Sequence, residues 1–160
     1  MCDGGLVIDL SLMKAIEMDA PSGTVRAQAG VLWAELDRAT QASGPAVPGG
    51  TDSEVGIAGL TLGGGNGWLM GLYGATCDNL LAADVVMADG RSVSASDAEN
   101  GDLFWALRGG GGNFGSSPRS AIAFIPLVRR SSAARSCMRI RTLGKSCAGS
   151  GSSHRRLPIR

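Results

Sequence analysis

The sequence lacks the cysteine patterns that mark a disulfide framework or a zinc site. Its four cysteines, Cys2, Cys77, Cys137 and Cys147, form no C-x-x-C pair and have no regular spacing. We therefore expect free thiols rather than disulfides or a metal centre.

Long apolar runs are also absent, so the sequence indicates no membrane-spanning segment and no membrane partner. The start, Met-Cys-Asp-Gly-Gly, has no basic segment followed by an apolar stretch, and no signal peptide is expected. The default expectation from these two features is a cytoplasmic protein.

Acidic residues are absent from residues 116–160, which carry ten Lys and Arg. Residues 1–115 contain all 14 acids and only five bases, so the formal net charge of +1 hides two segments of opposite charge. Such a basic segment is typical of proteins that bind nucleic acid or an acidic surface. A non-catalytic protein whose basic tail makes such contacts is therefore one functional hypothesis.

Glycine is abundant, with 25 residues, and it clusters where the chain also carries large apolar side chains. The first cluster lies within residues 55–79 and has glycines at 56, 59, 63, 64, 65 and 67. Backbone without Cβ atoms lets N–H groups approach a flat or anionic ligand closely. The second cluster is Leu107–Gly115. Flexible linkers would not include Ile57, Leu62, Trp68 and Phe114, which we expect to be buried, so the two clusters indicate a bound cofactor.

The remaining pattern predicts short strands interspersed with helices. Strands are expected at residues 6–10, 16–19, 24–29, 83–88 and 92–95, and helical segments at 12–15, 31–43, 67–73 and 103–107. Asp89-Gly90 is a strong signal for a two-residue hairpin turn. This order predicts the α+β class rather than a doubly wound parallel sheet. A Rossmann dinucleotide site is disfavoured because no G-x-G-x-x-G follows a first strand and opens a long helix.

Several blocks occur in the order known from one flavoprotein family. They are residues 5–11, 46–50, 56–68, 77–80, 88–90 and 102–115. Together they resemble the FAD-binding domain of the p-cresol methylhydroxylase/vanillyl-alcohol oxidase superfamily, and within it the bacterial berberine-bridge-enzyme-like oxidases. The resemblance covers residues 3–115, which makes it far more specific than a single glycine motif.

The resemblance implies FAD as the cofactor and a small molecule as the substrate of the intact family. In that family the substrate gives a hydride to N5 of the flavin. By matching motif, backbone and hydroxyl contacts to FAD are expected from Gly56, Ile57, Ala58, Gly59 and Thr61. Close approach of the cofactor is expected at Gly63, Gly64 and Gly65.

Three departures from the family pattern limit what the resemblance implies. The loop that grips the pyrophosphate and often carries a flavin-linked His is missing, and the only histidine here is His154. Asp52 stands where doubly linked members have a Cys. The substrate domain is also missing. We therefore expect an incomplete domain that binds FAD non-covalently, if at all, and that is inactive alone.

The family motif continues beyond Asn-Phe-Gly with Val-Val-Thr, the strand that closes the FAD domain. Residues 116–126 can be encoded by nucleotides that, read one base out of frame after a G, give Val-Val-Thr-Ser-Phe-Arg-Tyr-Arg-Leu-His-Pro. We therefore interpret residues 116–160 as a frameshift-derived tail with no nucleic-acid role. The expected consequences are a lost closing strand, a disordered tail and early proteolysis after Arg119, Arg129 or Arg135. A polypeptide with no stable fold stays a third hypothesis.

Overall fold

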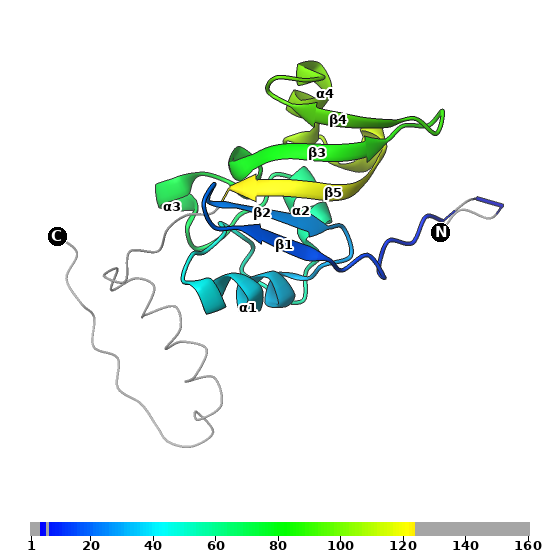
Figure 1. The fold of residues 1–160 in the computed structure, drawn as a ribbon. Helices are drawn as coiled ribbons and strands as arrows, with labels where there is room; N and C mark the ends of the chain where they lie inside the picture. The colour runs from blue at the N-terminus through cyan, green and yellow to red at the C-terminus, as the bar shows by residue number, and fades with distance from the viewer. Residues whose placement is uncertain (1–3, 6, 124–160) are drawn as a thin grey trace, which may run out of the picture. The chain divides into compact units, whose positions relative to one another are not determined.

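The computed structural model describes residues 4–5 and 7–123, all within the first of two compact units, Met1–Leu127. Its centre is a five-stranded sheet in the order β1-β2-β5-β3-β4, with every neighbouring pair antiparallel (Figure 1). The strands are β1 (Ile16–Asp19), β2 (Thr24–Gln28), β3 (Leu80–Val86), β4 (Ser92–Ser96) and β5 (Ser116–Ala123). The antiparallel sheet with interspersed helices confirms the predicted α+β class.

Two hairpins join strands that the sequence predicts, and the second has its turn at the predicted Asp89-Gly90. Gly23 has a φ of +66° between β1 and β2, and Gly90 has a φ of +82° between β3 and β4. Glycine adopts these left-handed conformations without the steric cost that a Cβ brings. The N–H of Gly90 donates to the carbonyl oxygen of Met87 at 2.9 Å and closes the second turn. The β3–β4 hairpin is therefore confirmed, although β3 begins at Leu80, three residues earlier than predicted.

The strand β5 corrects the prediction that the closing strand is lost. Residues 116–123 pair with β2 on one side and β3 on the other, so β5 fills the middle of the sheet (Figure 1). A ladder is made by main-chain groups, which any residue except proline supplies in full. The β3–β5 register shifts between Asp84 and Val86, close to Pro118, whose nitrogen has no hydrogen to donate. The predicted disorder of the tail concerns residues 124–160, which lie outside the described residues.

The first helix follows its predicted bounds closely. Helix α1 (Trp33–Ser43) begins after Leu32, whose N–H donates to the Glu35 carboxylate at 2.8 Å. Lys14 forms an ion pair with the same carboxylate at 2.8 Å. The helix ends at Gly44, which has a φ of +95°. Gly44 is the stop signal that the sequence contains, whereas the bond from Leu32 to Glu35 at the start is seen only in the structure.

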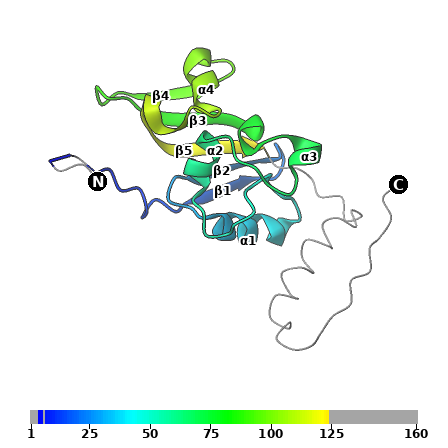
Figure 2. The ribbon, with the colours of Figure 1, turned by 180° about the vertical axis from the view of Figure 1, so that it is seen from behind.

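The other helical segments are short. They are α2 (Ile57–Leu62), α3 (Met70–Tyr73), α4 (Gly101–Leu107) and the 3-10 turns η1 (Thr76–Asn79) and η2 (Gly111–Phe114). Helix α2 was not predicted; it contains Gly59 and is flanked by Gly56 and Gly63, three glycines of the first cluster. Figure 2, seen from behind, shows α1 and α2 on one side of the sheet.

The core lies between these helices and the sheet. Trp33 and Leu36 enter it from α1, Ile57 and Leu62 from α2, and Phe104 and Leu107 from α4. They pack against sheet residues that include Val25, Ala27, Leu80, Ala83, Val85 and Ala95. Burial of this apolar surface is the main favourable contribution to folding of the domain.

Two sequence predictions on apolar residues are wrong. Residues 7–10 form no strand, and the side chains of Val7 and Ile8 are exposed. Trp68 is 71% exposed and Phe114 is also exposed, although both were expected to be buried. A run of apolar residues becomes a strand only when another strand is there to pair with it, which local sequence does not reveal.

A candidate cofactor-binding surface

The first glycine cluster is held in place by main-chain hydrogen bonds to the start of α1. The N–H of Trp33 donates to the carbonyl oxygen of Val55 at 3.0 Å, and the N–H of Ile57 donates to that of Val31 at 2.9 Å. Gly56, between them, forms an isolated antiparallel bridge with Leu32. These bonds position the first turn of α2 against the end of β2 and the start of α1.

Three of the predicted site glycines face open space. A Cβ atom added at Gly56, Gly59 or Gly64 would meet no other atom within 4 Å. Gly64 also has a φ of +101°, which a larger residue rarely adopts. The chain therefore presents bare backbone at these three positions, as a flat ligand requires.

The other two predicted glycines have other atoms in front of them, and only at Gly65 does packing exclude a side chain. A Cβ at Gly65 would collide with the side chains of Thr76 and Leu60. A Cβ at Gly63 would lie 3.2 Å from the carbonyl oxygen of Gly59. The glycine triplet is also tied to η1, because the N–H of Thr76 donates to Gly65 O at 2.9 Å and that of Cys77 to Gly64 O at 2.8 Å.

The remaining predicted site residues lie on α2 with different exposures. Ile57 is 1% exposed and belongs to the core. Thr61 is fully buried, and its hydroxyl donates to the carbonyl oxygen of Ile57 at 2.7 Å. Ala58 is half-buried. The Thr61 hydroxyl is thus engaged inside the helix, and among the predicted contacts only backbone at Gly56, Gly59 and Gly64 has open space in front of it.

The structure brings the second glycine cluster to the end of the first. The N–H of Gly109 donates to the carbonyl oxygen of Leu62, the last residue of α2, at 3.0 Å. Cβ atoms at Gly109, Gly111 and Gly112 would meet nothing within 4 Å. The two clusters, separated by more than forty residues in the sequence, therefore form neighbouring parts of one surface.

Sequence reasoning missed Arg108, which anchors this second cluster. Its Nη2 donates to the carbonyl oxygen of Leu80 at 2.9 Å, and its guanidinium lies 4.4 Å from the centre of the Phe104 ring. The position of Arg108 directly before a glycine run was the one sequence signal for this role. Only the fold shows that its side chain lies beside Leu80, the first residue of β3.

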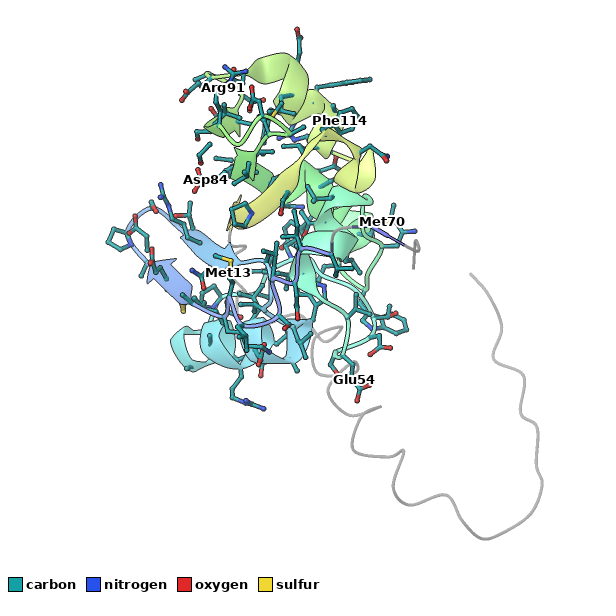
Figure 3. All side chains as sticks on the ribbon, turned by 90° about the vertical axis from the view of Figure 1, so that its right-hand side faces the viewer. Met13, Glu54, Met70, Asp84, Arg91 and Phe114 are labelled. Carbon is teal, nitrogen blue, oxygen red and sulfur yellow. The ribbon has the colours of Figure 1, made fainter. Side chains whose placement is uncertain are left out.

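Side chains near the surface include exposed apolar groups and a buried thiol. Figure 3 marks Glu54 just before α2, Met70 in α3 and Phe114 at the end of η2. Met70, Leu72 and Trp68 are exposed. Burial, reinforced by the neighbouring Asp78 carboxylate, raises the pKa of the Cys77 thiol. Cys77 is therefore a packed thiol rather than an activated nucleophile.

Asp52, the residue that replaces a possible cysteinyl link, is exposed. Its carboxylate accepts a hydrogen bond from the N–H of Glu54 at 2.9 Å. Within residues 4–5 and 7–123 no three His, Cys, Asp or Glu side chains gather in a way that could hold a metal ion. None of the helices in this described part is long and apolar enough to cross a bilayer.

The antiparallel sheet, its helices and the open glycines are compatible with the flavin-binding domain that the sequence resembles, and comparison with known proteins shows the family. The family model for the FAD binding domain matches residues 1–96. The chain therefore belongs to this family, whose cofactor is FAD, and the resemblance read from the sequence is confirmed.

The chain is similar to part of several FAD-linked oxidoreductases. It is 49% identical over 111 residues to the FAD-linked oxidoreductase pgmH of Aspergillus terreus, covering 69% of this chain and 23% of that protein. It is 39% identical over 128 residues to (R)-6-hydroxynicotine oxidase of Paenarthrobacter nicotinovorans, covering 80% and 28%. The chain thus spans about a quarter of the length of these relatives.

The fold matches the same group of proteins. The crystal structure of 6-hydroxy-D-nicotine oxidase from Arthrobacter nicotinovorans superposes with a TM-score of 0.75 at 38% identity, covering 76% of this chain and 27% of that one. For a berberine-bridge-enzyme-like protein of Physcomitrella patens the TM-score is 0.71 at 30% identity, covering 73% and 26%. The incomplete FAD-binding fold expected from the sequence is confirmed by this partial coverage.

The residues of the surface fit FAD. The flavin is a planar ring system, which needs a bare, flat backbone, and Gly56, Gly59 and Gly64 supply such backbone with open space in front. No side chain at these three positions would obstruct the ring. The surface at these positions is thus bare main chain without charged side chains, which suits the flat face of a ring better than an ion.

Proposed function

We propose that this chain is the FAD-binding part of an FAD-dependent oxidoreductase. The observation that carries the proposal is the match of the FAD-binding-domain model to residues 1–96, and the open space in front of Gly56, Gly59 and Gly64 within that range agrees with it. When bound, FAD supplies an acceptor for the hydride that a small-molecule substrate loses. The chain's own residues bind and orient the cofactor, and we expect no turnover from this chain alone.

The predicted site residues divide between contact and support. Gly56, Gly59 and Gly64 contact the cofactor through their backbone. Ala58 flanks this contact, and Ile57 and Thr61 hold α2 in the core from the opposite side. Gly63 and Gly65 let the following segment return close to α2.

FAD binding by this chain is non-covalent in the proposal. His154 is the only histidine in the sequence, and Asp52 stands where a cysteinyl link would form. Acid precipitation after incubation with FAD is the measurement, and a colourless pellet without a flavin mass adduct is expected. A yellow pellet with the adduct on this polypeptide contradicts non-covalent binding and leaves the assignment of FAD itself intact.

Titration with FAD, followed by flavin fluorescence, tests the surface itself. We expect weak binding by the wild-type chain and at least about tenfold weaker binding by Gly59→Val, a loss of about 1.4 kcal/mol. The branched side chain would stand where the ring must lie. Gly101→Val is the matched control, because a Cβ at Gly101 also meets open space but lies at the start of α4. Equal binding by Gly59→Val and wild type contradicts the proposed surface.

The alternative function, a basic tail that binds nucleic acid or an acidic surface, stays a prediction from composition. Most of the segment that it concerns lies outside the described residues. Deletion of residues 124–160 separates the two hypotheses, because a binding tail would lose salt-dependent affinity for nucleic acid on deletion. FAD binding by the shortened chain is expected to match that of the full chain.

A further inference from the structure

Two glycines near the proposed FAD surface are required by space and not by backbone conformation. Neither Gly49 nor Gly67 has a positive φ, so other residues could adopt their main-chain angles. A Cβ at Gly49 would nevertheless collide with the six-membered ring of Trp33. A Cβ at Gly67 would collide with the carbonyl group of Gly49. Gly49 is therefore in close contact with both the Trp33 ring and Gly67, and we call these three residues the Trp33–Gly49–Gly67 stack.

The stack joins three segments that are far apart in the sequence. Trp33 is the first residue of α1, Gly49 follows Pro48 in the connection from α1 to α2, and Gly67 follows the glycine triplet. Trp33 is 1% exposed, and its own N–H bonds to the carbonyl oxygen of Val55 directly before Gly56. Trp33 thus holds two parts of the surface. Its backbone N–H fixes Val55, directly before Gly56, and its ring supports Gly49, against which Gly67 packs.

The indole N–H of Trp33 indicates that this side chain acts through the shape of its ring and not through a hydrogen bond. Its Nε1 is buried and has no hydrogen-bond partner within the described part of the chain. A buried donor without a partner is destabilising, whereas an apolar side chain would avoid that effect. Packing of the flat ring against Gly49 is the favourable contact that compensates for the unpaired N–H.

We propose that Trp33 is a positioning residue for the cofactor and that the Trp33–Gly49–Gly67 stack sets the spacing between Gly56–Gly59 and Gly64. The inference rests on the proposed function, because these are the glycines that contact FAD in that proposal. Close-packed interiors do not absorb an added methyl group without moving backbone. A methyl group inserted into the stack therefore separates the two halves of the FAD surface.

The test uses the full 160-residue chain with Trp68→Phe and Trp105→Phe, so that Trp33 is the only indole. Both replaced residues are exposed, at 71% and 79%. In this background we expect Gly49→Ala and Gly67→Ala to bind FAD more than tenfold more weakly and to shift the Trp33 emission to longer wavelength. Gly71→Ala is the matched control, since its Cβ meets open space, and it should change neither measurement.

A compensating pair distinguishes positioning from a general loss of stability. Trp33→Leu makes room for the methyl group of Gly49→Ala, so the double variant should bind FAD more tightly than either single variant. The visible absorption spectrum of bound FAD depends on the protein surface that contacts the flavin ring. In the double variant this spectrum should return toward that of wild type. If Gly67→Ala does not fold, Gly49→Ala and the double variant decide the question.

Two results overturn the inference. One is FAD binding by folded Gly49→Ala within twofold of its parent, and the other is additive weakening in the double variant. A parent chain that binds no FAD overturns the proposed function and, with it, the role of the stack in cofactor binding. These failures are distinguishable because only the last one affects the parent.

Discussion

The backbone N–H of Gly109 donates to the carbonyl oxygen of Leu62 at 3.0 Å, which joins the two glycine-rich segments of the chain. Leu62 is the last residue of α2, and carbonyl groups at a helix end have no partner within the helix. Gly109 has a φ of +120°, which glycine adopts readily and which strains other residues. One main-chain bond thus serves both as a helix cap and as the link between the two halves of the candidate site.

Arg108, next to this bond, should be sensitive to a change that keeps its charge. Arg108→Lys removes the hydrogen bond from Nη2 to Leu80 and the guanidinium packing on Phe104. We expect a loss of about 1–2 kcal/mol in the free energy of unfolding, measured by urea denaturation. Arg91→Lys is the control, because Arg91 is exposed and its pair with Asp89 contributes little. Equal stability of Arg108→Lys and the wild type would show that the anchor is dispensable.

Thr61 tests which face of α2 meets the cofactor. Its hydroxyl donates to Ile57 inside the helix, so Thr61→Val should leave the affinity for FAD within about twofold of wild type. Thr61→Ala leaves a cavity and should lower the free energy of unfolding by about 1 kcal/mol. Titration and urea denaturation measure the two effects. A tenfold loss of affinity in Thr61→Val, with stability retained, would instead support the direct hydroxyl contact that the sequence resemblance implies.

Cys77 should resist alkylation at neutral pH. Burial and the Asp78 carboxylate raise its pKa above the ordinary range for a thiol, so less of the reactive thiolate is present at a given pH than for a free cysteine. Iodoacetamide labelling of the Cys77 peptide, followed by mass spectrometry, should therefore rise as the pH increases beyond that range. Asp78→Asn should accelerate labelling, because it removes the neighbouring negative charge. Rapid labelling of native wild type at pH 7 would contradict the buried position.

Trypsin should spare Arg119 although the sequence suggests early cleavage there. Arg119 pairs through its backbone with Gln28 on one side and Asp84 on the other. A protease needs its substrate chain extended and free, so a central strand must open first. We expect the first products of limited digestion to end after Arg129 or Arg135, as mass spectrometry would show. Early cleavage after Arg119 in the native protein would mean that β5 is not stably paired.

Local sequence signals account for the parts of the fold whose contacts are close along the chain. Asp89-Gly90 encodes the β3–β4 turn, and Pro21 to Gly23 encode the β1–β2 turn. Helix α1 follows from its apolar spacing and from Gly44 after its end. The order of the glycine motifs identifies the FAD-binding family. Each of these depends on residues within a few positions of one another, or on a motif that can be read without coordinates.

Only the tertiary structure decides the features that depend on distant neighbours. Residues 116–123 form the central strand because β2 and β3 both offer free main-chain groups to them. Trp68 stays exposed although its apolar character suggested burial. Glycines of the same sequence cluster also differ in their surroundings. Gly59 faces open space, whereas Gly67 packs against the carbonyl group of Gly49. The physical reason is that space in front of a backbone is set by whatever packs there, and for Gly67 that neighbour lies eighteen residues away in the sequence.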